Sequence, residues 1–219
     1  RAAIKHGVGE FVLISTDKAV NPTSVMGATK RISEKVIMSL NSHNKTKFLA
    51  VRFGNVLGSS GSVVPLFKKQ IAAGGPITVT HPDIERYFMT IPEAVQLVIQ
   101  AGAMGQGGEV FVLDMGQPVK IVDLARDMIK LSGLTPDTDI KIEFTGLRKG
   151  EKLYEELLTA EEGVGTTKHA QIFMIKGKHA RIKELPKLLP QLYKAALTGR
   201  EDQVVAAIRK VIPGFRKEA

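Results

Sequence analysis

The amino-terminal quarter of the chain has the pattern of a strand, a helix and a second strand. A short continuous apolar run, Phe11–Ile14, is typical of a central parallel strand that is buried on both faces. The break at Asn21–Ser24 offers a helix cap, and residues 24–41 place apolar side chains on one broad helical face. Residues 48–53 form the next apolar run. Strand, crossover helix and strand make the basic unit of an α/β sheet.

The remaining chain continues this alternation of short strands and amphipathic helices. A loop rich in glycine and serine, residues 54–62, follows the second strand. Beyond it the pattern predicts helices over 63–73, 92–104 and 120–132, strands over 77–79, 110–113 and 140–144, and helical structure from about residue 180 onward. The order of these elements indicates an α/β protein.

Composition places the chain among ordinary globular proteins. Of its 219 residues, 43% are apolar and 24% are charged, as in a domain with a substantial core. No apolar run reaches the length of about 18 residues that a membrane span needs, so we expect no span in this segment. Residues 1–7 lack an initiator Met and the apolar core of a signal peptide, and they read as the end of a helix. We therefore expect the chain to belong to a longer protein.

The sequence gives no sign of a metal site. It contains no cysteine, which excludes disulfides and thiolate ligands. The histidines are scattered without the spacing of metal ligands, so we expect structural roles for all of them. They are His6, His43, His81, His169 and His179.

Positive charge collects at the carboxy-terminal end. The formal charge is +9, and residues 168–219 hold 12 Lys or Arg against 4 Asp or Glu, so most of the excess lies there. Such a tail can meet nucleic acid, an anionic membrane face or solvent alone. Because it has neither aromatic–basic interleaving nor a nucleic-acid-binding motif, we expect a solvated helical surface and no nucleic-acid partner. A membrane-facing patch is the second alternative.

The strongest chemical feature is the pairing of Ser15–Lys18 with Met26–Lys30. Ligands of open α/β sheets bind beyond the carboxyl ends of the strands, where Thr16, Asp17 and Lys18 fall. Met26 and Lys30 are four residues apart and share one face of the following helix. A hydroxyl, a carboxylate and two ammonium groups would then converge on one cleft. The alternative is an exposed turn with ordinary charges.

Five segments together resemble the UDP-N-acetylglucosamine 4,6-dehydratases of bacterial capsule and glycan assembly, in the extended short-chain dehydrogenase/reductase superfamily. The resemblance extends over residues 5–175 and is more specific than any single dinucleotide fingerprint. The segments are Ser15–Thr23, Met26–Arg31, Val51–Ser59, Arg86–Thr90 and Gly146–Leu153.

The resemblance implies the second half of a doubly wound Rossmann-type parallel sheet and a small α/β substrate-binding lobe. Residues 1–60 and 92–115 would form the carboxy-terminal half of the dinucleotide-binding domain. Residues 61–91 and 116–175 would form the lobe that binds the nucleotide sugar, and residues 176–219 would form a basic helical tail.

The resemblance also implies roles around the first strand. Thr16 would hydrogen-bond the C4 oxygen of the sugar, Asp17 would be the acid and Lys18 the base at C5. Ser15, Thr16 and Lys30 would contact the cofactor, with Lys30 on the nicotinamide ribose. Loss of water across C5 and C6 needs such a base and acid, once oxidation at C4 has acidified the C5 proton. Burial and neighbouring charge can tune an adjacent Asp and Lys for both tasks.

Met26 stands where most of the superfamily has a catalytic Tyr, and the large, often membrane-bound dehydratases resemble this chain in that respect. A thioether cannot accept the proton of the C4 hydroxyl. That step falls to Asp17, a water or another group. Ordinary helix packing is the alternative role for Met26, and the two can coexist.

A second set of residues resembles the substrate contacts of the family. Asn55 would contact the sugar diphosphate, with Val64 assigned to the same substrate site, and Arg86 and Arg148 would clamp the diphosphate and uridine. Guanidinium suits this task because it pairs with two phosphate oxygens at once. Glu151 would bind the ribose hydroxyls of the nucleotide. Taken singly, each of these residues is more often part of a surface ion pair than a ligand contact.

The implied cofactor is NAD or NADP, yet the sequence has no Gly-x-Gly-x-x-Gly turn between a strand and a long helix. We therefore expect weak or no NAD(P) affinity and no turnover for this chain alone, with the amino-terminal half of the same enzyme as its missing partner. The resemblance further implies a UDP-sugar substrate, a homo-oligomer and a bacterial, cytoplasmic enzyme, at the inner face of the membrane in the full-length protein.

The function expected from these features is NAD(P)-dependent 4,6-dehydration of a UDP-N-acetylhexosamine to a 4-keto-6-deoxy sugar for surface polysaccharide or glycan synthesis. A C4 or C5 epimerase of nucleotide sugars is one alternative. A catalytically silent, truncated substrate-binding module is another, and an interaction protein that acts through its basic tail is a third.

Overall fold

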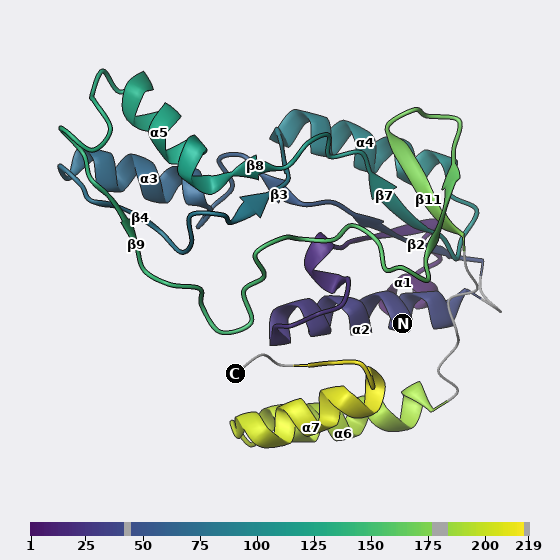
Figure 1. Cartoon of the computed structure of the whole chain (residues 1–219). Helices are drawn as coiled ribbons and strands as arrows, with labels where there is room; N and C mark the ends of the chain where they lie inside the picture. Colours follow the sequence, from purple (N-terminus) through teal and green to yellow (C-terminus); the bar gives the residue numbers. More distant parts are fainter. Residues whose placement is uncertain (42–44, 177–183, 217–219) are drawn as a thin grey trace. The chain divides into compact units, whose positions relative to one another are not determined.

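The computed structural model describes residues 1–41, 45–176 and 184–216 (Figure 1). The chain divides into two compact units, each of which is described by itself. The first consists of Arg1–Phe53, Leu97–Asp114 and Glu156–Ala219, and the second of Gly54–Gln96 and Met115–Glu155. Helix α4 (Ile91–Met104) contributes residues to both units.

The first unit is built on a five-stranded sheet with the order β1-β2-β7-β11-β10. Strands β1 (Glu10–Ile14), β2 (Lys47–Arg52) and β7 (Val110–Leu113) run parallel, with Val12 opposite Leu49 and Val51 opposite Phe111. All four residues of β7 and five of the six in β2 are buried, as expected for central strands covered on both faces. The predicted α/β class and the positions of these strands are confirmed. The prediction that Phe11–Ile14 forms a central strand buried on both faces is wrong, because β1 lies at the edge of the sheet and none of its residues is buried.

The sheet is mixed, whereas the sequence predicted a parallel one. Strand β11 (Ile172–Lys176) runs antiparallel to β7, and β10 (Gly163–Thr166) runs antiparallel to β11. A short connection between two adjacent strands forces the antiparallel direction, because a parallel return needs a crossover of a dozen residues or so. Residues 156–175, which the sequence assigned to the lobe, belong to the first unit, and β10 and β11 extend its sheet.

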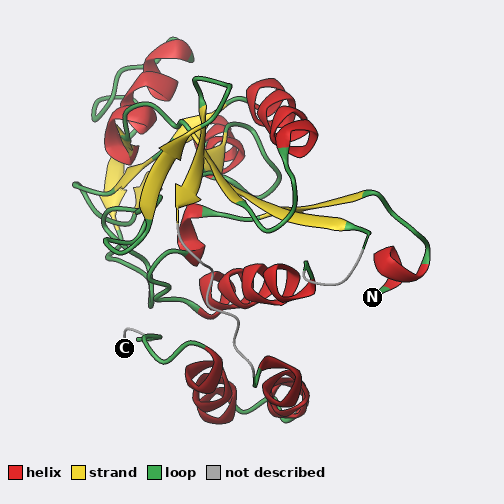
Figure 2. Ribbon diagram, turned by 90° about the vertical axis from the view of Figure 1, so that its right-hand side faces the viewer, coloured by secondary structure: helices red, strands yellow, loops and turns green. Residues whose placement is uncertain are grey.

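Helix α2 (Val25–Leu40) covers one face of this sheet (Figure 2). The Ser24 hydroxyl caps the helix by accepting a hydrogen bond from the Gly27 amide at 3.1 Å. Ile37 and Met38 pack against Phe48, Val110 and other apolar residues of the sheet. The short helices α1 (Ala2–Lys5) and η1 (Asp17–Ala19) lie on either side of β1 in the sequence.

The carboxy-terminal helices pack on the opposite side of α2. Helices α6 (Leu185–Leu197) and α7 (Glu201–Val211) form a hairpin. Its apolar residues, among them Ile208, and Phe215 after the end of α7 form one core with Ala28 and Ile32 of α2. The leucine spacing predicted this helical region, although residues 177–183 and 217–219 of the expected tail lie outside the described residues. The described part of the tail thus forms a buried core with α2 in the first unit.

The second unit is built from α3 (Val63–Ala72), α5 (Ile121–Leu131) and three small two-stranded sheets. Its core joins Phe67 of α3 and Ile129 of α5 to the strand residues Ile77 and Val79. The sheets pair β4 (Ile77–Val79) with β9 (Ile142–Phe144), β3 (Asn55–Val56) with β6 (Phe88–Met89), and β5 (Glu85–Arg86) with β8 (Val119–Lys120).

None of the helices described combines the length and apolar composition needed to cross a lipid bilayer.

Candidate active site

The turn that follows β1 is fixed to the end of β2 by its backbone. The Ser15 amide donates to the Val51 carbonyl at 2.8 Å, and the Asp17 amide donates to the Phe53 carbonyl at 3.1 Å. Gly27 in the first turn of α2 packs directly on this turn, because a Cβ added there would collide with the backbone oxygen of Lys18. The backbone of Thr16–Lys18 is therefore held from two sides.

Asp17 is fully buried at this turn, and its two carboxylate oxygens differ. Oδ1 accepts hydrogen bonds from the Thr16 hydroxyl at 2.7 Å, the Lys18 amide at 2.8 Å and Lys18 Nζ at 3.0 Å. Oδ2 is buried without a hydrogen-bond partner among the described residues. Buried carboxylate oxygens are normally paired, so an unpaired one calls for an explanation, of which a catalytic role is one. Three donors thus orient the group while one oxygen can accept a proton or a ligand.

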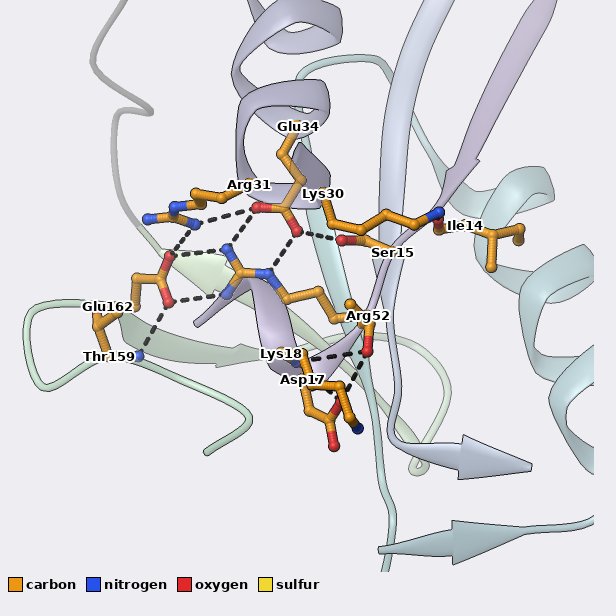
Figure 3. A network of polar contacts seen from close by, with 11 residues as sticks. Ile14, Ser15, Asp17, Lys18, Lys30, Arg31, Glu34, Arg52, Thr159 and Glu162 are labelled. Carbon is orange, nitrogen blue, oxygen red and sulfur yellow. Dashed lines mark hydrogen bonds and ion pairs between the residues drawn. The ribbon is translucent and has the colours of Figure 1, made fainter. Parts of the chain in front are cut away.

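The two lysines expected at the site both reach the end of β1 (Figure 3). Lys18 keeps 24% of its side chain exposed while Nζ contacts Asp17. Lys30 extends from α2 and donates from Nζ to the Ile14 carbonyl at 3.2 Å, two residues before Thr16. The structure therefore brings Thr16, Asp17, Lys18 and Lys30 to one end of β1.

Met26 lies in the first turn of α2 with 49% of its surface exposed. It is one helical turn before Lys30 and shares its face. The side chain is not buried in a helix interface, which was the alternative role that the sequence left open.

A buried ionic network lies beside this turn and was not anticipated from the sequence. Arg52, the last residue of β2, is fully buried and donates to Glu34 of α2 through Nε at 2.7 Å and Nη2 at 2.8 Å. It also donates to Glu162 through Nη1 at 2.9 Å and Nη2 at 3.1 Å. Arg31 bridges both carboxylates at 3.1 Å. We refer to Arg31, Glu34, Arg52 and Glu162 as the buried quartet, in which Glu34 and Arg52 are buried and Arg31 and Glu162 are partly exposed (Figure 3).

Ser15 connects the buried quartet to the turn. Its hydroxyl donates to Glu34 Oε1 at 2.6 Å, so the only proton of this side chain is already engaged. The sequence assigned Ser15 to the cofactor. The structure places the side chain, 4% exposed, against Glu34.

The electrostatics of the buried quartet follow from its geometry. Burial raises the pKa of Glu34, but hydrogen bonds and charge attraction from Arg52, with smaller effects of Ser15 and Arg31, lower it overall. Burial also raises the pKa of Glu162, while Arg52, the Thr159 amide and Arg31 lower it to about 2. Burial opposes the charge of Arg52, yet its two carboxylate partners raise its pKa. The carboxylates of Glu34 and Glu162 and the guanidinium of Arg52 therefore remain charged together.

The second unit brings together three of the five expected substrate residues. Glu151 accepts from the Thr80 hydroxyl at 3.2 Å and from the Arg148 amide at 3.0 Å, and it contacts Arg86 Nη2 at 3.5 Å. Arg86 is held further by the Glu85 carbonyl at 2.7 Å, the Leu153 carbonyl at 3.2 Å and Glu155 at 3.8 Å. The Arg148 residue is exposed, so its guanidinium can meet a ligand.

Asn55 and Val64 occupy neighbouring elements of the same unit. Asn55 opens β3, and its amide donates to the carbonyl of Tyr87, the residue after Arg86, at 3.0 Å. Val64 lies in the first turn of α3, after the loop that contains Gly58 and Gly61. Both glycines have positive φ angles, 75° and 73°, which explains why this loop needs them.

Across the described ranges, no group of three or more Asp, Glu or His side chains is arranged to hold a metal ion. His43 and His179 lie outside those ranges.

Comparison with known sequences identifies one protein family for this chain. A family model described as "Polysaccharide biosynthesis protein" matches residues 1–177. The capsular polysaccharide biosynthesis protein CapD of Staphylococcus aureus is 72% identical over 156 residues, which are 71% of this chain and 26% of CapD. A UDP-glucose 4-epimerase of Rickettsia canadensis is 40% identical over 74% of this chain and 47% of its own length. The chain thus spans about a quarter to a half of these relatives.

Comparison with solved structures agrees with the sequence comparisons. Pen from Bacillus thuringiensis superposes with a TM-score of 0.74 at 39% identity, over 82% of this chain and 57% of Pen. DesIV, a dTDP-glucose 4,6-dehydratase from Streptomyces venezuelae solved with NAD and TYD bound, gives a TM-score of 0.63 at 21% identity, over 71% of this chain and 53% of DesIV. The DesIV likeness shows a shared fold, and that relative binds NAD.

Proposed function

Because the chain belongs to the polysaccharide biosynthesis protein family, we propose that it is part of an NAD(P)-dependent 4,6-dehydratase of UDP-N-acetylhexosamines. The product would be a 4-keto-6-deoxy sugar for surface polysaccharide or glycan assembly. The observation that carries this proposal is the fully buried Asp17, oriented by Thr16 and Lys18, with one oxygen left for the reacting sugar.

The contact between Asp17 and Lys18 suits an elimination. In the ion pair the proton lies on Lys18, and it can pass to Asp17 along the 3.0 Å contact. The amine then takes the C5 proton while the acid protonates the departing C6 hydroxyl. A C–H and a C–O bond break, a C5–C6 double bond forms and water leaves. Lys18 is again an ammonium and Asp17 a carboxylate, so the elimination restores the charges of the pair.

NAD or NADP, when bound, supplies the removal of a hydride from C4 and its return to C6. Lys30 fits the nicotinamide side, because its ammonium reaches the carboxyl end of β1, where doubly wound sheets bind ligands. Since the sequence has no glycine-rich turn for the pyrophosphate, we propose that residues outside this chain complete the cofactor site. Met26 cannot take the C4 hydroxyl proton, and that step is left to Asp17, a water or another group.

Recognition of the UDP-sugar would use the second unit. We propose that Arg148 and Arg86 meet the diphosphate and uridine, that Glu151 meets the ribose hydroxyls and that Asn55 and Val64 line the sugar diphosphate. The support is the shared network of Arg86, Glu151 and the Arg148 backbone. Glu151 accepts three hydrogen bonds there, and a carboxylate has about four acceptor positions, so it keeps capacity for a ligand hydroxyl.

A C4 epimerase is the second candidate function. The 40% identity to a UDP-glucose 4-epimerase favours it. The Asp17–Lys18 pair favours elimination, because C4 epimerisation needs neither an acid at C6 nor a base at C5.

The test is product analysis with the complete protein that contains this chain, incubated with UDP-N-acetylglucosamine and NAD or NADP. Proton NMR should show a 4-keto-6-deoxy sugar with a new C6 methyl signal. A C4 epimer that keeps its C6 hydroxymethyl group would overturn dehydration in favour of the epimerase. Binding of the UDP-sugar in calorimetry without any product would leave a silent binding module.

A further inference from the structure

We propose that Glu34 and Arg52 are positioning residues of the reaction, which they serve by holding Ser15 and hence the turn that carries Asp17 and Lys18. This inference rests on the proposed function. It concerns residues that the reaction chemistry does not use and that do not contact the sugar.

The first argument is that both carboxylate oxygens of Glu34 are occupied by hydrogen bonds within the protein. Its Oε1 accepts from Ser15 at 2.6 Å and from Arg52 Nε at 2.7 Å, and its Oε2 accepts from Arg52 Nη2 at 2.8 Å and Arg31 at 3.1 Å. Glu34 is 2% exposed, so no hydrogen-bonding capacity faces solvent. Four donors fix this carboxylate, and through Oε1 the carboxylate fixes the Ser15 hydroxyl.

The second argument is that the buried quartet joins every element of the candidate site in the first unit. Glu34 lies one helical turn after Lys30 on α2. Arg52 lies on β2 between Val51 and Phe53, whose carbonyls accept the amides of Ser15 and Asp17. A shift of Arg52 would therefore move the acceptors that hold the turn as well as its side-chain anchor.

The third argument concerns what the charges do for stability. A buried ion network gains little net stability over apolar residues of the same shape, because desolvation offsets the attraction. Two-point pairing of Arg52 with both carboxylates, however, sets the spacing of three segments closely. Catalytic groups displaced by about 1 Å can lose about 100-fold in rate. The buried quartet therefore contributes more to the relative positions of these segments than to the free energy of unfolding.

The test compares Glu34→Gln with Glu10→Gln in the complete protein. Glu34→Gln keeps the shape of the side chain and removes its charge. Glu10 is the matched control, because it pairs with Lys47 at 3.2 Å across the same two strands, with both side chains 40% exposed. We expect Glu34→Gln to lower kcat by about 100-fold with KM within threefold, and Glu10→Gln to change both by less than twofold. A raised KM with unchanged kcat in Glu34→Gln would overturn the proposal.

A double-mutant cycle with Ser15→Ala tests the route of action. If Glu34 acts through Ser15, adding Ser15→Ala to Glu34→Gln lowers kcat no further than the larger single effect. Multiplied effects would contradict this route. Should Glu34→Gln fail to fold, Glu162→Gln replaces it. This variant keeps the contacts among Ser15, Glu34 and Arg52 but neutralises the second carboxylate that holds Arg52, so we expect a loss in kcat of about tenfold. An unchanged kcat in Glu162→Gln would then overturn the proposal.

Amide hydrogen exchange separates this inference from the proposed function. The Ser15 and Asp17 amides should exchange faster in Glu34→Gln than in Glu10→Gln, whichever sugar is the substrate. Equal exchange at both amides would reject positioning. A complete protein that turns over no nucleotide sugar, but shows the difference in exchange, would reject the proposed function alone.

Discussion

At the scale of the residue, Asp17 concentrates the chemistry of the site. It is one of few charged side chains with no exposed surface, and one of its oxygens has three donors while the other has none among the described residues. The sequence predicted its position at the end of a strand from the pattern of apolar residues and the family resemblance. The asymmetry of its two oxygens could not be predicted, because it depends on side-chain rotamers.

Replacing Asp17 with Asn should lower kcat by about 100- to 10,000-fold, because the amide cannot protonate the departing hydroxyl. Binding of UDP in calorimetry should stay within threefold, since the proposed nucleotide contacts lie elsewhere in the sequence. Retention of more than a tenth of the wild-type kcat would remove Asp17 from the role of acid.

Gly27 is a second important residue, because it allows α2 to pack closely on the turn that carries Lys18. Its replacement by Ala should cost about 1–3 kcal/mol of unfolding free energy, because the added Cβ meets the backbone oxygen of Lys18. Gly9→Ala is the control, since nothing lies within 4 Å of a Cβ at that position. Urea denaturation of both variants measures the difference, and equal stabilities would show that α2 and the turn can separate without cost.

At the scale of the element, the sequence predicted that α6 and α7 are helices but not that they form a buried core with α2. The leucine spacing predicted helices, and the charge suggested a solvated surface. The structure adds that Ala28, Ile32, Ile208 and Phe215 form one core. Strand β10 was missed because two of its four residues are glycines. Strand β11 was not predicted either, although its first four residues form an apolar run. The buried quartet was missed because its ion pairs join residues up to 131 positions apart.

The α6–α7 hairpin should be required for stability. Ile208→Ala removes a fully buried side chain and should cost about 2–5 kcal/mol. Leu197→Ala, on the same hairpin but 70% exposed, should change stability by less than about 0.5 kcal/mol. Thermal denaturation compares the two, and an Ile208→Ala variant as stable as Leu197→Ala would show that the hairpin does not fold onto α2.

The buried quartet should also shape the response to acid. The folded pKa of Glu162 is lowered from 4.5 to about 2, so its contribution is present above pH 4.5 and is lost as the pH falls toward 2. Glu162→Gln should therefore flatten the decline of stability over that range, and Glu34→Gln should flatten it in the same direction, because the pKa of Glu34 is lowered as well. Urea denaturation between pH 2 and 6 measures this. A decline as steep as that of the unaltered protein would contradict the lowered pKa values.

At the scale of the whole molecule, the sequence predicted the α/β class and the family, and both are confirmed. Long apolar runs and closely spaced motifs carry that information in a few neighbouring residues. The mixed sheet depended on a hairpin whose pairing is set by tertiary contacts, which local patterns do not reveal. The assigned roles of the site residues stay predictions.

The chain alone should bind UDP but form no product from UDP-N-acetylglucosamine, with or without NAD or NADP. The reason is that it lacks the glycine-rich turn for the pyrophosphate. Calorimetry and NMR measure the two properties. A 4-keto-6-deoxy product from the chain alone would show that its own residues suffice for the cofactor.

The enclosure of the buried quartet has a consequence for ionic strength. Dissolved ions screen charges that water reaches, such as Lys47 and Glu10, and they screen enclosed charges much less. Raising the potassium chloride concentration should weaken the attraction of a diphosphate to an exposed cation such as Arg148. The ion pairs of Arg52 with Glu34 and Glu162 should persist. Under the proposed function, affinity for the nucleotide sugar would then fall as the salt concentration rises, while the alignment of Asp17 and Lys18 would be kept.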